Sequence, residues 1–376
     1  MFHMKTILSK IKLLLGLALN KPLIGPNAVS IETTHQCNYR CLFCESHGSR
    51  LKNDILKSRE YFKNKTVMEF YIFQNLIDDL YKLGTRKIAL SGKGEPLMHP
   101  EFIKFISYAK QKGMHCTVFT NGTLINQELL KKIIVANLDE LNISLNAASE
   151  EVHKIISGRN EYSEIIECIK EISRFKNERK LKNPKIILSN VIFSKNYKEI
   201  ENMLSLGKEL SVNEIVFSHV GTFLETADLG LTPEIINEII DNVGCLKKDF
   251  LNNPKNNLSE FLRGLKICTQ SFHKTNKIQT KLPCYAAWIF AVISPDGTVR
   301  PCCYCEDILG NLYHQSFSKI WKSTQYRYFR KMSKNLHKFP ESISSCKCFT
   351  TCNYWKYNLY IYNKLHPFSR ISLTKI

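Results

Sequence analysis

Three cysteines that fall within eight residues constrain this chain more than any other feature. Cys37, Cys41 and Cys44 form a C-x3-C-x2-C pattern in the run ETTHQCNYRCLFCES. A cubane iron–sulfur cluster normally takes four cysteine thiolates. Three thiolates on one short loop therefore predict a cluster whose fourth iron binds something other than protein. A structural zinc site and buried packing thiols are the alternatives.

The cysteine loop, the preceding IETTHQCN and the aromatic Phe43 resemble the radical S-adenosylmethionine (SAM) superfamily. The resemblance implies a [4Fe–4S] cluster whose open iron is chelated by the amino and carboxylate groups of SAM. In that family, electron transfer from the cluster splits SAM into methionine and a 5′-deoxyadenosyl radical, which takes hydrogen from the substrate. Because the cofactor carries this chemistry, the sequence assigns no catalytic side chain.

Length and cysteine usage place the chain among intracellular two-part enzymes. Its 376 residues exceed one ordinary domain. Its 14 cysteines are unevenly spread over a long chain, unlike a secreted disulfide framework. Because clusters need reduced thiols, the expected compartment is the cytoplasm, with peripheral membrane contact as a further option.

The N-terminal residues 1–27 have an apolar run after several basic residues. The run is short, is interrupted by Gly16 and lacks a small-residue cleavage pattern, so we expect a helix packed on the domain. Interfacial membrane contact and a signal peptide are the alternatives.

The formal net charge of +19 bears on partners rather than on fold. Such a surface attracts polyanions, including nucleic acid and anionic membrane, although background composition explains it equally well. No RNA-binding signature is visible, so nucleic acid is not the expected partner.

Strands and helices alternate through residues 28–223, which predicts an α/β fold with a parallel sheet and right-handed crossovers. The resemblance implies the partial (β/α)6, TIM-like barrel of the radical SAM core. Residues 224–283 read as a helical connector. The expected strands are 28–33, 86–92, 115–122, 139–146, 185–193 and 213–219.

The end of the second expected strand carries SGKGEP, in which Gly92, Gly94, Glu95 and Pro96 match the family's G-G-E-P position. Glycines let backbone approach a ligand closely. In the family this motif contacts the amino group of SAM. Lys93 stands where the family usually has another glycine. An ordinary βα turn is the alternative.

Four further residues match SAM contacts of the family. Asn121 lies in the TNG turn at the mouth of the third strand, where α/β barrels place ligand groups. Ser144 and Asn146 are two residues apart and share a face of the fourth strand, where the family contacts the SAM ribose. Arg159 resembles the family's arginine near the SAM carboxylate. Turn, capping and purely structural roles are the alternatives.

The C-terminal residues 284–355 contain a second set of cysteines. Cys284 and Cys302 flank a PDG turn, which predicts a hairpin that brings them together. The C-x12-G-x4-C spacing resembles SPASM and twitch domains, which bind auxiliary [4Fe–4S] clusters. The ligand candidates for one auxiliary cluster are Cys284 and Cys302 with two of Cys346, Cys348 and Cys352.

Other cysteines leave alternatives open. Cys303 and Cys305 supply enough thiols for a second auxiliary cluster, and zinc is an alternative metal. Packing roles are expected for Cys116, Cys168, Cys245 and Cys268. The tail 356–376 is basic and aromatic, so we expect a packed helix, with a membrane surface as the alternative partner.

Together these features predict a radical SAM oxidoreductase or modifying enzyme acting on a small molecule, sugar or peptide. An auxiliary cluster favours net oxidation or substrate positioning. The expected partner that supplies electrons is a flavodoxin or ferredoxin. An RNA-modifying radical SAM enzyme and a non-catalytic iron–sulfur scaffold or electron carrier are the alternatives, which retention on a polyanion and reductive SAM cleavage would distinguish.

Overall fold

The computed structural model describes residues 7–51, 67–221, 224–244, 246, 255–272, 282–338 and 355–367. Cys346, Cys348, Cys352 and Cys245 lie outside these residues, as do residues 368–376 of the tail.

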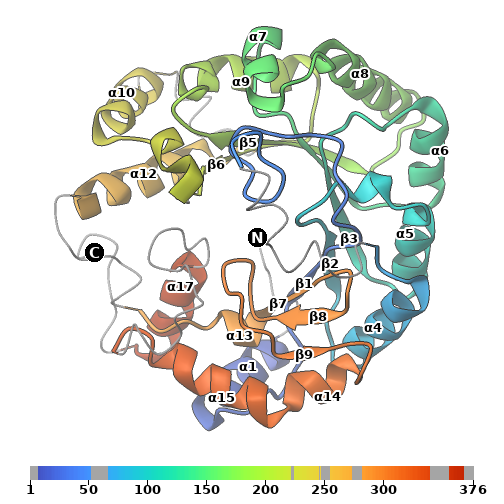
Figure 1. Cartoon of the computed structure of the whole chain (residues 1–376), viewed down its shortest axis with the longest axis vertical. Helices are drawn as coiled ribbons and strands as arrows, with labels where there is room; N and C mark the ends of the chain where they lie inside the picture. Colours follow the sequence, from blue (N-terminus) through green and yellow to red (C-terminus); the bar gives the residue numbers. More distant parts are fainter. Residues whose placement is uncertain are drawn as a thin grey trace.

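A curved nine-stranded sheet organises the described part of the chain (Figure 1). Its order is β6-β5-β4-β3-β2-β1-β7-β8-β9, and neighbours from β6 through β7 run parallel. The six core strands are β1 (Ala28–Ile31), β2 (Lys87–Leu90), β3 (His115–Thr120), β4 (Glu140–Ser144), β5 (Lys185–Ile192) and β6 (Glu214–His219). Each lies within a range expected from the sequence.

Helices surround the outside of this sheet (Figure 1). Their apolar sides pack on the strand residues that face outward, and Phe73, Phe105 and Ile169 are fully buried there. The covering helices are α4 (Phe70–Lys82), α5 (Phe102–Gln111), α6 (Gln127–Val135), α7 (Glu150–Ser157), α8 (Tyr162–Glu178) and α9 (Ile200–Glu209), with the short turns η1 (Pro96–Met98) and η2 (Tyr197–Glu199). This α/β architecture confirms the expected partial (β/α)6 barrel.

The opposite face of the core strands lines the interior of the curve. Register pairing places Ser30, Ala89, Thr117 and Glu140 on this inner face, because they are direct neighbours on β1 to β4. Since side chains alternate along a strand, Ser144 lies on the same face two pairs further along β4. The carboxyl ends of these parallel strands meet at one edge of the sheet, where ligands bind in open α/β sheets.

The C-terminal hairpin extends the core sheet beyond β1. Strand β7 (Phe290–Ile293) pairs parallel with β1, and β8 (Thr298–Arg300) and β9 (Gly310–Asn311) follow antiparallel. Gly297 closes the β7–β8 turn with a φ of 79°, as the PDG sequence predicts. The sequence assigned this hairpin to a separate small domain, whereas its strands share a sheet with the barrel.

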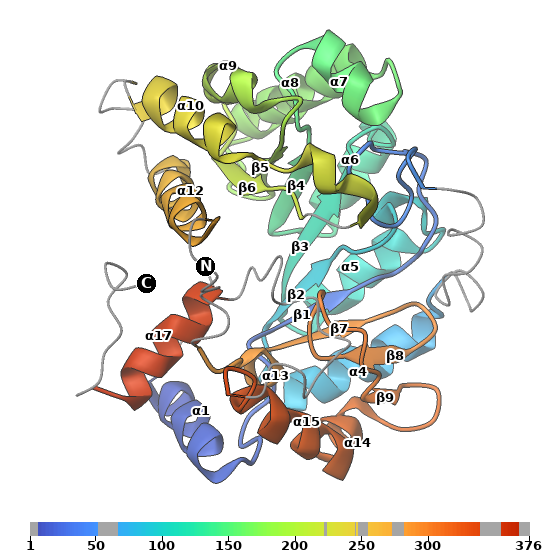
Figure 2. The same ribbon diagram turned by 60° about the vertical axis from the view of Figure 1, so that its left-hand side comes forward.

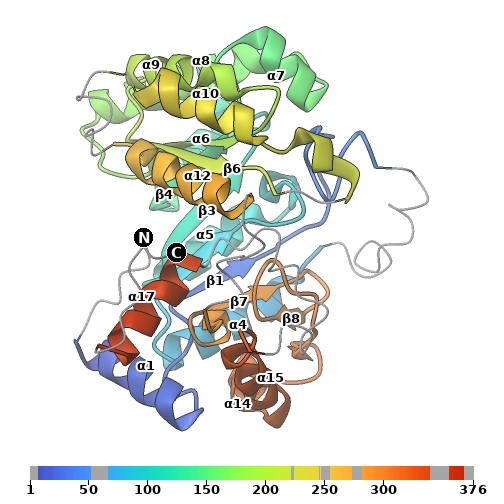
Figure 3. The ribbon, with the colours of Figure 1, turned by 90° about the vertical axis from the view of Figure 1, so that its left-hand side faces the viewer.

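The remaining helices lie at two places (Figures 2 and 3). Helices α10 (Pro233–Gly244) and α12 (Leu258–Phe272), with the turn η3 (Leu224–Leu229), follow β6 in the range expected for a helical connector. Helix α1 (Ile7–Leu19) lies beside α17 (Trp355–Leu365) in all three views, near α13 (Ala286–Ile289), α14 (Phe317–Lys322) and α15 (Thr324–Lys334). In the described part of the chain, no helix combines the length and apolar character that crossing a bilayer requires.

Candidate functional site

The cysteine loop begins directly after β1, at the carboxyl end of the sheet. Backbone hydrogen bonds compact it, from Cys44 N to Cys41 O at 2.9 Å and from Gly48 N to Cys44 O at 3.0 Å. The backbone N–H of His47 also donates to Cys44 Sγ at 3.3 Å. Hydrogen bonds to cysteine sulfur tune iron–sulfur clusters. None of the three cysteines is in a disulfide, so each can serve as a ligand once its thiol loses its proton.

Two residues within the loop fasten it to the far side of the barrel. Leu42 N donates to Ile156 O at 2.7 Å, at the end of α7. The rings of Phe43 and Phe193 lie 5.3 Å apart, and Phe193, which directly follows β5, is fully buried. The loop is therefore held against the far strands as well as by its own turn.

Burial changes the acidity of the loop thiols. It raises the pKa of Cys37 to about 11 and raises the pKa of Cys41 further. Iron binds thiolate, so loading this loop must displace protons. Within the residues that the structure describes, no group of three His, Cys, Asp or Glu side chains is close enough to hold a single metal ion.

The glycine-rich turn after β2 packs on the chain that leads into Cys37. A Cβ on Gly94 would lie 2.3 Å from Thr34 O, so only glycine fits at this contact. Next to it, Glu95 N donates to Gln36 O at 2.7 Å. The turn thus supports the cysteine loop directly through its backbone.

Both oxygens of the Glu95 carboxylate accept hydrogen bonds from within the protein. One oxygen accepts from Thr120 Oγ1 at 2.7 Å and from Leu97 N at 3.1 Å, and the other accepts from Asn121 N at 2.8 Å. Burial raises the pKa of Glu95, although the bonds from Asn121 and Thr120 act in the opposite direction. Glu95 therefore caps η1 at Pro96 and joins β2 to the TNG turn.

Asn38, which directly follows Cys37, accepts hydrogen bonds from two of the predicted residues, Asn121 and Arg159. Asn121 Nδ2 donates to Asn38 Oδ1 at 2.8 Å, and Asn38 Nδ2 donates to Thr123 Oγ1 at 2.8 Å. Arg159 Nη2 donates to the backbone oxygen of Asn38 at 3.2 Å. The cysteine loop, the TNG turn and the arginine after α7 thus form one hydrogen-bonded group. Sequence reasoning missed Asn38, although its place beside the first cysteine was a usable signal.

The two residues predicted on β4 have different surroundings. Ser144 lies on the inner face, in register with Ser189 of β5. Asn146 has a φ of 61°, and its Oδ1 accepts from Val191 N at 2.8 Å. Its carboxamide oxygen therefore supports the β5 backbone, which is the structural alternative for this residue, and SAM contact through either side chain stays a prediction.

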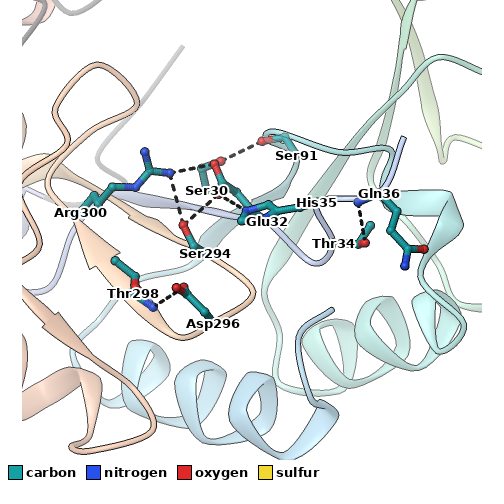
Figure 4. A network of polar contacts seen from close by, with 10 residues as sticks. All are labelled: Ser30, Glu32, Thr34, His35, Gln36, Ser91, Ser294, Asp296, Thr298 and Arg300. Atoms are coloured by element: carbon teal, nitrogen blue, oxygen red, sulfur yellow. Dashed lines mark hydrogen bonds and ion pairs between the residues drawn. The ribbon is translucent and has the colours of Figure 1, made fainter. Parts of the chain in front are cut away.

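A buried ionic network lies between β1 and the C-terminal hairpin (Figure 4). Glu32 Oε1 accepts from Arg300 Nη2 at 3.0 Å, and Glu32 Oε2 accepts from Ser294 Oγ at 2.9 Å. His35 Nε2 lies 3.2 Å from Glu32 Oε2. Burial opposes the charge on Glu32, but His35 and the cations Arg300 and Lys93 outweigh it, so the pKa of Glu32 is lowered. The network therefore joins the segment that leads into Cys37 to the hairpin that leads into Cys302.

Lys93, the departure from the family's glycine pattern, belongs to the same region. Burial and the nearby Arg300 lower the pKa of its ammonium to about 8, while Glu32, Glu45 and Glu306 act in the opposite direction. Glu45 directly follows Cys44, and Glu306 directly follows Cys305. This partly buried cation therefore lies within electrostatic reach of both cysteine regions.

The C-terminal cysteines within the described residues differ in exposure. Cys302 and Cys305 are buried, Cys284 is half-buried and Cys303 is exposed. The pKa of Tyr326 is raised mainly by burial, with Cys302 and Cys305 as nearby contributors. Cys302 and Cys305 therefore share a neighbourhood, which the spacing alone did not single out. Cys116 is fully buried and Cys168 is half-buried away from this region, as expected for packing residues.

The residues present fit a cluster and SAM. Three cysteines stand on one loop, and polar groups adjoin that loop from the ends of β2 and β3 through Glu95 and Asn121, and from the end of α7 through Arg159. Cys37, Cys41 and Cys44 would hold the cluster, which would supply the electron for SAM cleavage.

Sequence comparison agrees with this arrangement. The family model of the radical SAM superfamily matches residues 31–207, and the model of the SPASM iron–sulfur cluster-binding domain matches residues 284–353. The chain therefore belongs to the radical SAM superfamily and carries a C-terminal SPASM domain. It is an enzyme of the class that uses SAM and [4Fe–4S] clusters.

Known proteins of several activities are similar to the chain. The tungsten-containing aldehyde ferredoxin oxidoreductase cofactor-modifying protein of Pyrococcus furiosus is 26% identical over 87% of this chain and 88% of its own length. The AdoMet-dependent heme synthase of Methanosarcina barkeri is 25% identical over 88% of this chain and 90% of its own length. The subtilosin biosynthesis protein AlbA of Bacillus subtilis is 26% identical over 79% of this chain and 60% of its own length.

Solved structures support the fold. SuiB of Streptococcus suis bound to the precursor peptide SuiA has a TM-score of 0.61 at 15% identity, covering 98% of this chain and 80% of that one. Native anSMEcpe with bound AdoMet has a TM-score of 0.60 at 16% identity, covering 90% of this chain and 96% of that one.

Proposed function

We propose that this enzyme reductively cleaves SAM at the Cys37–Cys44 loop and abstracts hydrogen from an organic substrate, which is then oxidised or modified with help from an auxiliary [4Fe–4S] cluster. The observation that carries the proposal is the hydrogen-bonded group around Asn38, Glu95, Asn121 and Arg159. It joins the three cysteines to the residues that resemble SAM contacts. Bound SAM supplies the radical chemistry.

The chain's own part is to bind and orient. Backbone groups of the Gly92–Pro96 turn and the Asn121 amide present donors and acceptors toward the cysteine loop. Arg159 brings a guanidinium to the same place, and such a group suits a carboxylate. Ser144 offers a hydroxyl on the inner face, where a ribose would lie. Holding reactants in a fixed geometry is the main protein contribution in such a site.

We assign the auxiliary cluster to Cys284 and Cys302, together with two of Cys346, Cys348 and Cys352. Burial of Cys305 beside the residue that also neighbours Cys302 makes Cys305 a further candidate ligand. An electron donor such as a flavodoxin or ferredoxin would reduce the first cluster. An auxiliary cluster that accepts an electron from the substrate favours net oxidation.

A peptide is the first substrate class to test, ahead of a sugar or another small molecule. AlbA acts in the biosynthesis of a bacteriocin, and two structural neighbours, SuiB and anSMEcpe, have been solved with bound peptides. The heme synthase and the cofactor-modifying protein keep small organic molecules in the candidate set.

The proposal is tested by substrate-dependent turnover. The reconstituted enzyme would be mixed anaerobically with SAM, a reductant and deuterated peptides, sugars or porphyrin-type compounds. We expect one class to accelerate 5′-deoxyadenosine formation and to transfer deuterium into it. Acceleration by tRNA alone would instead favour the RNA-modifying alternative, and a loaded cluster that never cleaves SAM would favour a scaffold.

A further inference from the structure

Helix α1 has a strip of large apolar side chains on its outward side. The opposite side of the helix is packed, with Leu13, Gly16 and Leu17 buried. The exposed fractions in the strip are 77% for Ile7, 59% for Leu8, 47% for Ile11, 50% for Leu15 and 61% for Leu19. An apolar face of a helix is normally covered by protein or by lipid. Here the described residues cover only one side.

Two lysines border this strip. A helix turns by about 100° per residue, which places Lys10 on one flank of the strip and Lys12 on the other. Both side chains are exposed. The first acidic residue of the chain is Glu32, so α1 has no negative charge along or before it. An apolar face with lysines at its borders is the pattern of helices that lie in a lipid interface.

The helices next to α1 also carry basic residues and no acidic ones. Lys334 Nζ of α15 donates to Leu17 O at 2.8 Å, which fixes α15 against α1. Helix α17 lies beside α1 in Figures 2 and 3. Neither α15 nor α17 contains an acidic residue. Each also exposes a tyrosine, Tyr328 and Tyr360, the residue type enriched at membrane–water interfaces.

We propose that this end of the molecule docks on an anionic lipid bilayer, with the α1 strip in the interface and the surrounding lysines on the headgroups. A protein partner fits less well, because lysine is depleted in protein–protein interfaces. A lipid bilayer can bind the apolar strip and the surrounding lysines at the same time. Apolar side chains leave water, and basic ones meet an anionic surface within a Debye length.

The test is flotation of the reconstituted full chain with vesicles of phosphatidylcholine containing about one-third phosphatidylglycerol, beside pure phosphatidylcholine vesicles. We expect the protein to float with the anionic vesicles and to be released by salt. Ile11→Glu with Leu15→Glu should lower the partition coefficient at least about tenfold. Lys10→Gln with Lys12→Gln should lower it about 25-fold, from about fivefold per charge.

Val135→Glu is the matched control, because Val135 is 85% exposed at the end of α6, away from α1. It should leave flotation unchanged, and this variant and the α1 variants should keep the SAM cleavage of the parent. Failure of the parent chain to bind anionic vesicles would overturn the proposal. An equal loss of vesicle binding in Val135→Glu would also overturn it. So would light scattering that shows a dimer which the α1 substitutions dissociate while flotation stays unchanged.

Binding of RNA in place of vesicles would assign the basic surface to nucleic acid. A Cys41→Ala variant should float normally, which separates this surface from the proposed catalytic function.

Discussion

Glu32 fills the space that a side chain on Gly92 would need. A Cβ on Gly92 would lie 2.3 Å from Glu32 Cγ and 2.9 Å from Glu32 Cδ. Gly92 also has a φ of 134°, a region that other residues rarely adopt. The first glycine of the SGKGEP turn is therefore needed for the buried ionic network as well as for any contact with a ligand.

Gly92→Ala should lower the free energy of unfolding by about 3–5 kcal/mol, since backbone strain adds to the overlap with Glu32. Gly113→Ala is a matched control, because Gly113 also has a positive φ but an added Cβ there meets nothing within 4 Å. It should cost about 1–2 kcal/mol. Urea unfolding measures both. Equal losses would show that the contact with Glu32 does not matter, whereas the account expects Glu32→Ala to relieve part of the Gly92→Ala loss.

Lys93→Met should stabilise the protein at neutral pH. Burial and Arg300 lower the pKa of Lys93 to about 8, below the ordinary 10.5. Below about pH 8 Lys93 is charged in both the folded and the unfolded protein, so the folded protein bears the full free-energy cost of burying that charge. As the pH rises from about 8 toward 10.5, the folded chain loses this proton first and the cost disappears.

The expected gain for Lys93→Met is about 1–2 kcal/mol at about pH 7, shrinking toward about pH 10. The exposed Lys131→Met should change stability by less than about 0.5 kcal/mol. A loss of stability at neutral pH for Lys93→Met would mean that its attraction to Glu32, Glu45 and Glu306 outweighs burial.

Arg159→Ala should weaken SAM binding about tenfold, because it removes the charge-assisted contact that we propose with the SAM carboxylate. Iron content of the first cluster should stay the same, since the cysteines and their turn are unchanged. Anaerobic calorimetric titration measures the affinity, with the exposed Arg179→Ala as the control. Unchanged affinity together with lost iron would assign Arg159 to holding Asn38 alone.

Arg330→Lys should destabilise the C-terminal part of the chain by about 2–3 kcal/mol. Arg330 is fully buried and donates from Nε to Ala287 O at 3.0 Å and from Nη1 to Trp321 O at 2.8 Å. Its guanidinium also lies 4.2 Å from the centres of the Trp321 and Tyr326 rings. Lysine cannot reproduce this planar arrangement. Arg327→Lys, on the exposed side of α15, should have little effect on the melting temperature, and equal shifts for the two variants would contradict this role.

The sequence predicted the core strands and the cysteine loop because both depend on local patterns. Strand alternation and C-x3-C-x2-C spacing can be read within a few residues. The Glu32–Arg300 contact joins positions that are 268 residues apart, and no local sequence pattern near either residue predicts the other as its partner. The period-2 relation of Ser30 and Glu32 was the available signal that Glu32 faces inward.

Two other features depended on tertiary structure. Strand β7 pairs with β1, so the C-terminal hairpin extends the barrel sheet, which no linear spacing reveals. Asn146 lies two residues beyond the end of β4, and its carboxamide supports β5 through Val191, a contact set by the left-handed backbone at that residue. Local patterns thus predicted the candidate site, while the hydrogen bonds among its residues depend on the fold.

The most direct test of the account is reductive SAM cleavage without added substrate. The enzyme would be reconstituted anaerobically with iron and sulfide, given SAM and dithionite, and analysed for 5′-deoxyadenosine. Cys41→Ala removes one thiol of the loop, and Cys168→Ala removes a half-buried thiol elsewhere. The account predicts product from the parent and from Cys168→Ala, and none from Cys41→Ala. Product that survives in Cys41→Ala would contradict the assignment of the reaction to this loop.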